Sequence, residues 1–281
     1  MTPQTAPPWL ARIKPWLAAA GAALIVAGLA VEELARRYVV AESAQFVTFA
    51  MVAPALIVLG APWRLLRLSG APAGGTTAGP PPASPEPAGP AARRAPLDRL
   101  AASRQRQTSF LRAGGYLVTF IAVSVAWRLP PVMDALARQP VLVLPELVTL
   151  LAAGTGLWLE LVPSPPLAPR LPKPHRAATA ALAMWSAWAV AYVLGMSNHA
   201  VLHGYDPAGG ALSAAADQQI TAALVWAVSA ACFVPVVFVT MLGWLSGGDS
   251  PDEELQRLAR DERQHPVVRG WGRPARGRPG S

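Results

Sequence analysis

An acid and two amides, Asp217, Gln218 and Gln219, stand directly before a long apolar run. A carboxylate at that point can accept backbone N–H groups at a helix start, so for Asp217 alone the simplest interpretation is an N-cap of its own helix. Capping does not explain Gln218 and Gln219, whose amides suit hydrogen bonds between membrane helices. Arg128 and Glu146 also lie near the ends of apolar runs. These five residues are the first candidates for a site.

The composition favours a lipid bilayer over water as the solvent. Of the 281 residues, 53% are hydrophobic and only 14% are charged. A helix of about 20 apolar residues is long enough to cross the hydrocarbon of a membrane. The sequence therefore predicts an all-α, polytopic bundle of six transmembrane helices, at residues 16–31, 44–59, 113–133, 141–162, 177–195 and 220–245.

Two segments separate or follow these helices. Residues 69–112 form a Pro/Ala/Gly-rich stretch that cannot bury enough apolar surface to offset its ordering entropy, so we expect a disordered linker. The predicted parts are the first two helices (1–68), this linker, a four-helix part (113–246) and a tail (247–281). Basic residues are concentrated in the linker and the tail, which by the positive-inside rule places both termini in the cytoplasm. The abundance of Arg, Ala and Pro suggests a GC-rich bacterial genome, and hence a multi-pass protein of a bacterial plasma membrane.

This topology gathers the unusual polar residues on the extracytoplasmic side. Ionisable groups at membrane depth are costly and tend to face a bundle interior or a wet cavity. We therefore predict an outer polar cluster, made of Arg128, Glu146, Asp217, Gln218 and Gln219. The alternative for any single member is a helix end that meets lipid headgroups and water.

Three stretches carry a resemblance to a known family. They are "TFAMVAPALIVLGAPWRLL" (48–66), a run from 126 to 158, and "LSAAADQQITAALVW" (212–226). They resemble the bacterial CtaG-type cytochrome c oxidase assembly proteins over roughly residues 42–245. The resemblance implies a polytopic membrane protein associated with copper delivery to, and maturation of, haem-copper oxidases. Asp217, Gln218 and Gln219 occupy the place of a family signature.

The chain departs from the family where the family carries histidines. A His-Met-x-x-His pattern is replaced by a run that begins at Glu42. Arg128 stands where the family has the histidine of a Trp-His pair, and only Glu146 remains of a His-x-x-Glu-His pattern. If those histidines are copper ligands, this chain lacks them, and Arg128 is a poor neighbour for a copper cation.

Other residues offer a replacement for the missing ligands. Met196, His199 and His203 are spaced by three and four, so on a helix they would share one face. Thioether and imidazole ligands together suit copper. The alternative is an exposed loop whose histidines touch water or headgroups.

The sequence thus predicts an assembly or maturation factor for a haem-copper oxidase, with possible copper delivery on the extracytoplasmic side. Its expected partners are an oxidase subunit and membrane lipids. One alternative is an accessory subunit of a respiratory complex that binds no metal; another is a small-solute or ion permease that uses Arg128, Glu146 and Asp217. The motifs of common enzymes are absent, so we expect no enzyme. The net charge of +8 lies mainly beside the spans, which favours lipid headgroups over nucleic acid as its partner.

Overall fold

The computed structural model describes residues 8–63, 109–164, 169, 171–196, 202, 204, 205 and 213–246. Most of the predicted linker, the predicted tail, His199 and His203 lie outside these residues. The chain divides into two units, Met1–Met241 and Leu242–Ser281, and all contacts reported below lie within the first.

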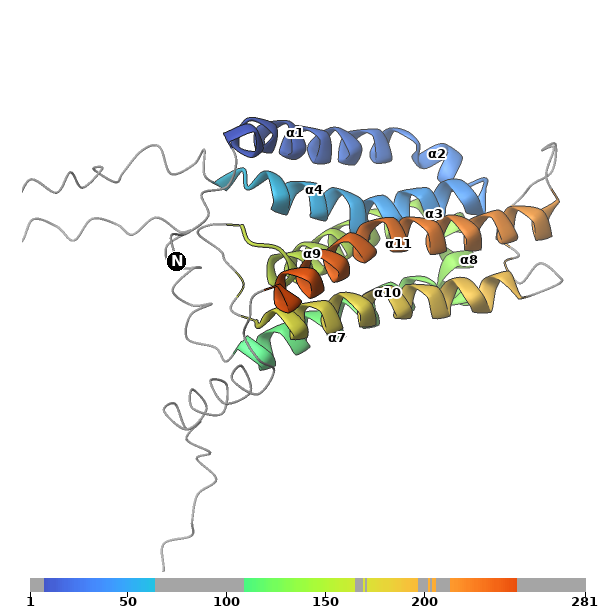
Figure 1. Ribbon diagram of the computed structural model, residues 1–281. Helices are drawn as coiled ribbons and strands as arrows, with labels where there is room; N and C mark the ends of the chain where they lie inside the picture. The colour runs from blue at the N-terminus through green and yellow to red at the C-terminus, as the bar shows by residue number, and fades with distance from the viewer. Residues whose placement is uncertain are drawn as a thin grey trace, which may run out of the picture. The chain divides into compact units, whose positions relative to one another are not determined.

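Helices make up the regular structure of the described residues, which confirms the all-α prediction (Figure 1). In chain order they are α1 (Pro8–Ala30), α2 (Glu32–Ala35), α3 (Val39–Val47), the π-helix η1 (Thr48–Val52), α4 (Ala53–Gly60), α7 (Ser109–Trp127), α8 (Pro130–Arg138), the 3-10 helix η2 (Pro140–Leu142), α9 (Val143–Leu161), α10 (Lys173–Gly195) and α11 (Ala214–Leu245).

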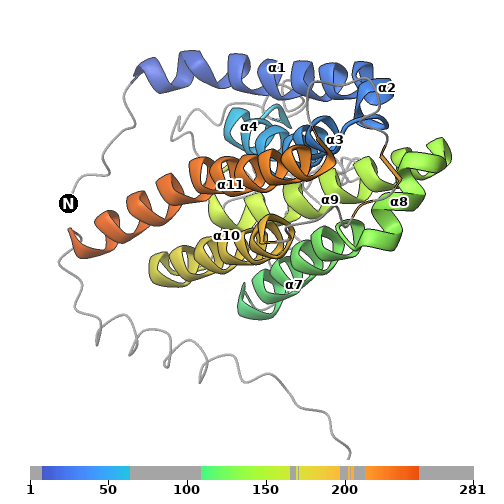
Figure 2. The same cartoon turned by 90° about the vertical axis from the view of Figure 1, so that its right-hand side faces the viewer.

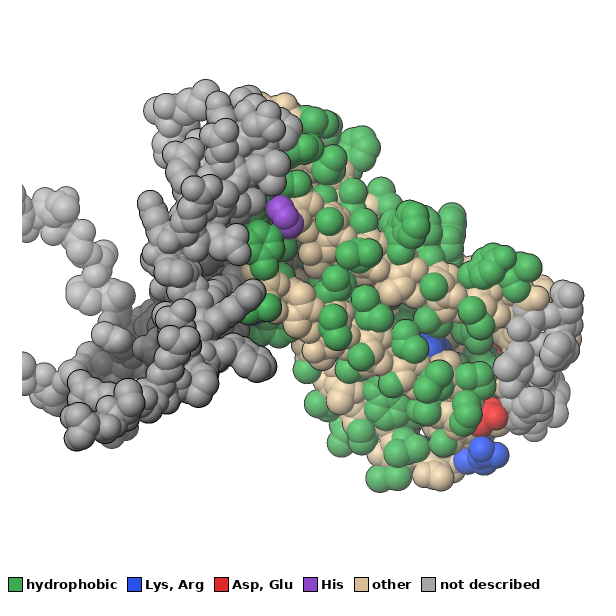
Figure 3. Space-filling view, turned by 90° about the horizontal axis from the view of Figure 1, so that it is seen from below, with side chains coloured by type: hydrophobic (Ala, Val, Ile, Leu, Met, Phe, Trp, Pro, Cys, Tyr) green, Lys and Arg blue, Asp and Glu red, His purple; other side chains and the backbone are tan. Residues whose placement is uncertain are grey.

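Five helical segments are long and apolar enough to cross a membrane. They are Val39–Gly60, Phe110–Trp127, Pro140–Leu161, Lys173–Gly195 and Ala214–Leu245. The first predicted span, 16–31, corresponds to a shorter apolar helix, Lys14–Ala30. The face in Figure 3 is covered by hydrophobic side chains, and its few acidic and basic side chains gather toward one end. A polytopic helical bundle is therefore confirmed, whereas the cytoplasmic placement of both termini stays a prediction.

The third predicted span, 113–133, is wrong in its extent. α7 ends at Trp127, and a separate helix, α8, begins at Pro130. Leu129 is extended (φ −65°, ψ 131°), as the residue before a proline prefers. Pro130 and Pro131 lack the N–H groups that would continue α7 but fit the first turn of a new helix. Arg128 thereby falls in the junction between the two helices.

The π-helix η1 has a local cause in Pro54. A proline has no N–H to donate, so the carbonyl of Ala50 loses the partner that an α-helix would supply at this position. Gly154 of α9 packs against that carbonyl, so closely that a Cβ built on it would lie 2.2 Å from the oxygen of Ala50. Glycine at position 154 therefore sets how near α9 comes to the helix formed by α3, η1 and α4.

α9 lies in the middle of the described packing, in contact with α4, η1, α7 and α10 (Figure 2). Aromatic rings join it to its neighbours. Trp158 of α9 stacks on Phe233 of α11 with ring centroids 5.4 Å apart, and Phe120 of α7 meets the edge of Phe233 at 6.2 Å. All three rings are at most 2% exposed.

The close approach at Gly154 yields a test of the packing. Gly154→Ala puts a methyl group into the carbonyl of Ala50, so we expect a loss of about 1 to 3 kcal/mol of stability from overpacking. Thermal unfolding of the purified protein in detergent measures it. Gly115→Ala in α7 is the matched control, because a Cβ there meets nothing within 4 Å; equal losses in both variants would contradict the role given to Gly154.

Candidate functional site

Asp217 caps a helix other than its own. Its carboxylate accepts the backbone N–H groups of Val39 at 2.9 Å and Val40 at 3.0 Å, the first two residues of α3. Tyr38, at the N-cap position of α3, supplies no side-chain cap. The N-terminus of α11 is instead served by Ser213, whose Oγ accepts the N–H of Ala216 at 3.2 Å. The expectation that Asp217 caps its own helix is therefore wrong, since the carboxylate is used 178 positions away in the sequence.

Two side-chain amides bind carbonyl groups at the C-terminal ends of other helices. Gln218 donates to the carbonyl of Leu194, in the last turn of α10, at 2.8 Å. Gln45 of α3 donates to the carbonyl of Gly28, in the last turn of α1, also at 2.8 Å. The last carbonyls of a helix have no partner within the helix, and in a membrane each unpaired one costs several kcal/mol. Gln219, by contrast, is exposed.

A buried ion pair joins α3 to the junction after α7. Arg128 binds Glu42 through two parallel bonds, from Nη1 at 2.6 Å and from Nη2 at 3.0 Å. Nη1 also donates to Ser43 Oγ at 2.8 Å, and the guanidinium carbon lies 3.8 Å from the ring centre of Phe46. The side chains of Arg128 and Glu42 are 1% and 5% exposed. Charge-assisted bidentate bonds of this kind are among the strongest that side chains form.

Glu146 of α9 stands beside this pair. It is 2% exposed, it lies within the influence of the charges of Glu42 and Arg128, and its carboxyl group also shares a side-chain hydrogen bond with that of Glu42. Its Oε1 has no hydrogen-bond partner among the residues that the structure describes. The same holds for the hydroxyl of Tyr205. Both residues line one small cavity. We call Glu42, Ser43, Arg128, Glu146 and Tyr205 the buried polar cluster.

Tyr205 is held over the cluster by its neighbours. The N–H of Gly204 donates to Asp134 of α8 at 2.7 Å. The ring of Tyr205 packs with Val39 and Met133 in a small apolar cluster. Burial raises the pKa of the Tyr205 phenol far above its usual range, and the negative charge of Glu42 acts in the same direction. The hydroxyl therefore keeps its proton at any physiological pH.

The rim of the cavity is charged. Arg36 and Glu32 of α2 line it. Glu33 binds both Arg36 and Arg37 at the surface. The hydrogen bond from Arg37, followed by the charge of Arg36, lowers the pKa of Glu33. Arg36 thus has a carboxylate partner outside the cavity.

The structure brings some of the predicted site residues together and not others. Arg128 and Glu146 meet in the buried polar cluster, and Asp217 of α11 binds the first two residues of α3, the helix that also carries Glu42. Gln218 is directed to α10, and Gln219 faces outward.

Of the three copper ligands that the sequence predicts, only Met196 lies among the residues that the structure describes. Met196 directly follows α10 and is 62% exposed. His199 and His203 lie outside the described residues, so this copper site stays a prediction. Within the described ranges, no group of three or more His, Cys, Asp or Glu side chains is placed to hold a metal ion. The buried polar cluster itself is a poor cation site, because the guanidinium of Arg128 already binds both carboxylate oxygens of Glu42.

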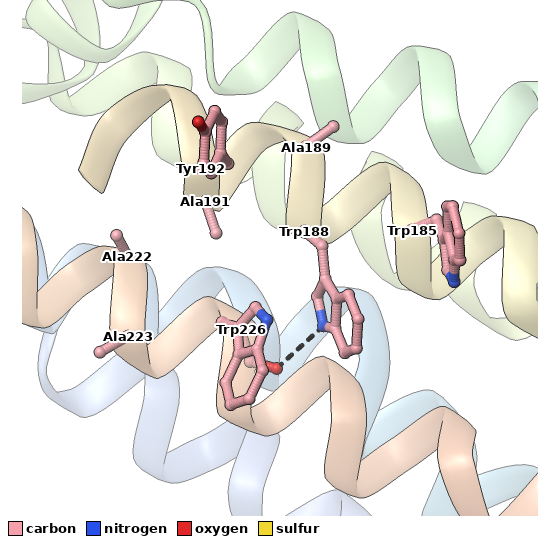
Figure 4. A pocket seen from close by; sticks show the side chains of 8 residues that line it. All are labelled: Trp185, Trp188, Ala189, Ala191, Tyr192, Ala222, Ala223 and Trp226. Carbon is pink, nitrogen blue, oxygen red and sulfur yellow. Dashed lines mark hydrogen bonds between the residues drawn. The ribbon is translucent and has the colours of Figure 1, made fainter. Parts of the chain in front are cut away.

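An apolar groove of about 570 Å³ lies between α10 and α11. Trp188 and Trp226 stack across it with ring centroids 5.2 Å apart, and Trp188 Nε1 donates to the carbonyl of Trp226 at 3.2 Å (Figure 4). The remaining lining is Trp185, Ala189, Ala191, Tyr192, Ala222 and Ala223. These side chains suit contact with lipid or another helix and carry no charge.

Two residues of the cluster were not singled out by sequence analysis, Ser43 and Tyr205. Ser43 directly follows Glu42, and a serine next to an acidic residue is too common in sequences to indicate a site. Tyr205 lies in the polar segment between α10 and α11, which the sequence alone favours as an exposed loop. Its burial depends on the contact of Gly204 with Asp134, which no local pattern reveals.

The fold and the site define a multi-pass helical membrane protein whose polar residues close helix ends and form one buried ion-pair cluster. The family model "Cytochrome c oxidase caa3 assembly factor (Caa3_CtaG)" matches residues 2–246. The chain therefore belongs to the Caa3_CtaG family of cytochrome c oxidase assembly factors, as the resemblance of its motifs predicted. No curated protein and no solved structure matches it.

The role of Asp217 can be tested through stability. Asp217→Ala leaves the N–H groups of Val39 and Val40 without their partner, so we expect a loss of about 1 to 2 kcal/mol, as for other helix caps. Chemical unfolding in detergent, followed by circular dichroism, measures the change. Gln219→Ala, two residues along the same helix, is the control and should change stability by less than about 0.5 kcal/mol. A neutral Asp217→Ala would refute the cap.

The ion pair yields a double-mutant prediction. Arg128→Met strips Glu42 of its partner and leaves a buried charge uncompensated, which costs about 3 to 5 kcal/mol. Removing both charges in Arg128→Met/Glu42→Met should recover most of that loss, because neither charge is then buried alone. The same unfolding measurement, made on both single variants and on the double variant, checks this. Additive losses would mean that the two side chains do not act as a pair.

Proposed function

We propose that this protein acts in the assembly of a cytochrome c oxidase by holding an oxidase subunit, through contact and without catalysing a reaction. Its place is the bacterial plasma membrane, and the contact surface lies on the extracytoplasmic side, at the end of the bundle that carries the buried polar cluster. Membership of the Caa3_CtaG family supports the role in assembly. The contact mechanism rests on one observation, the bidentate pair between Arg128 and Glu42.

That pair argues for contact over metal handling at this end of the bundle. The guanidinium, itself a cation, occupies both carboxylate oxygens of Glu42, which a bound copper ion would need as free ligands. The same bonds, with the cap by Asp217, join the start of α3 to α11 and to the end of α7. A docking surface gains from such rigidity, because a preorganised surface loses less entropy on binding.

Gln219 is the residue through which we expect contact. Its two neighbours, Asp217 and Gln218, are used inside the bundle, whereas Gln219 and Ile220 are exposed beside them. An amide at a membrane-exposed helix surface can bond to a polar group on a partner helix. If copper is also carried as cargo, Met196, His199 and His203 remain the proposed ligands.

Deletion and complementation test the proposal. Loss of the gene should lower oxidase activity and the haem absorption of the assembled oxidase, and the wild-type gene should restore both. Gln219→Trp should restore neither, although the purified variant unfolds at the wild-type temperature, because it blocks the surface without disturbing the interior. Val239→Trp, at an exposed position of α11, is the matched control and should complement fully. Ser213→Trp would not serve as a control, because Ser213 caps α11.

Two results would contradict this function. An intact oxidase in the deletion strain would remove the role in assembly and favour a permease. Copper that copurifies with the protein in about one equivalent, and is lost in His199→Ala/His203→Ala together with oxidase activity, would replace contact by copper delivery as the mechanism.

A further inference from the structure

Glu146 is a buried carboxyl group that lacks a counter-charge of its own. Glu42 and Arg128 satisfy each other through two bonds, so together they carry no net charge. An ionised Glu146 would add one uncompensated negative charge at a side chain that is 2% exposed. A lone buried charge is so unfavourable that such a group takes up a proton or binds a cation instead.

Three polar atoms without partners among the described residues belong to residues that line the same cavity. They are Glu146 Oε1, the hydroxyl of Tyr205 and Nε of Arg36. The space open to the centre of a water molecule is about 10 Å³, which is room for one water. A water in this cavity can accept from Arg36 Nε or Tyr205 and exchange a hydrogen bond with Glu146, whose Oε1 it would supply with a partner. The N–H of Arg36 makes the cavity unsuitable for a metal cation.

We propose that Glu146 is a proton-binding site, which exchanges its proton with the surface through one water molecule in this cavity. Uptake of the proton converts the carboxylate into the neutral acid and changes no other covalent bond. The neutral acid donates to the water, and the carboxylate accepts from it. The water passes the proton to solvent at the rim formed by Glu32 and Arg36.

The other charged and titratable groups around Glu146 do not offer it a cation. The groups that face it or its cavity are Glu42 from α3, Arg128 from the end of α7, Glu32 and Arg36 from α2, and Tyr205 from the segment before α11. Arg128 is bound to Glu42 and Arg36 to Glu33. A proton is therefore the positive charge that fits both the charge balance and the size of the cavity. This inference does not depend on the proposed contact with an oxidase.

Infrared spectroscopy of the full-length protein in lipid nanodiscs tests it directly. At neutral pH we expect the carbonyl band of one protonated carboxylic acid, which disappears in Glu146→Gln. Glu160→Gln is the matched control: Glu160 is equally buried, but Arg112 binds both of its oxygens, at 2.8 and 3.0 Å, so it should contribute no such band. Should Glu160→Gln not fold, Glu33→Gln at the surface serves instead.

The route of the proton is tested by isotope exchange. Transfer to D₂O should shift the band to lower frequency within the time needed to change the buffer, because one water connects Glu146 to solvent. In Tyr205→Phe the band should remain at a changed frequency, since the water loses a partner. Absence of the band in the wild type, its survival in Glu146→Gln, or a band that does not shift in D₂O would overturn the proposal. Loss of the band in Glu42→Gln with its retention in Glu146→Gln would assign the proton to Glu42 and equally overturn it.

Discussion

Helix ends are the costly places in a membrane bundle, because the last backbone groups of each helix have no partner within it and hydrocarbon offers none. Several helix ends among the described residues are closed by side chains from distant parts of the chain. Asp217 receives the first N–H groups of α3, and Gln218 reaches the last turn of α10. At the opposite ends of helices, Arg176 donates to Leu161 of α9 and Ser164 to Val58 of α4. Each bond gives a backbone group a partner and also links two distant parts of the chain, so the same bond that satisfies the backbone fixes the position of a helix.

The same constraint explains why the polar residues are at once conspicuous in the sequence and hidden in the structure. An acid and an amide at the start of an apolar run look like groups for a ligand. In the structure, Asp217 and Gln218 instead bind backbone groups of neighbouring helices. What remains for chemistry is smaller: the space between Glu146 and Tyr205, and the outward amide of Gln219. Arg128 is also used inside the bundle, since its guanidinium holds Glu42 and Ser43 in place.

The sequence correctly predicted the helical membrane class, most of the helix positions and the family, because these depend on local hydrophobicity and on contiguous motifs. It extended the third span by six residues, since hydropathy alone does not register that Pro130 and Pro131 start a new helix. The sequence could not predict the partners of Asp217 and Glu42, because these partners, Val39 and Arg128, lie 178 and 86 positions away. The absence of a capping residue before Val39 was the local sign that α3 needs help from elsewhere, and it becomes readable only once α11 is seen beside it.

The π-helix η1 also bears on what sequence changes this family member tolerates. A π-turn accommodates one residue more than an α-helix would, and one residue corresponds to about 100° of rotation around the axis. The half that carries Glu42 and Gln45 is thus turned relative to the half that carries Val58, and both halves direct these side chains inward. A single-residue deletion in Thr48–Val52 would remove this rotation and turn the carboxylate of Glu42 away from the guanidinium of Arg128. The number of residues in Thr48–Val52 is therefore constrained more tightly than their types.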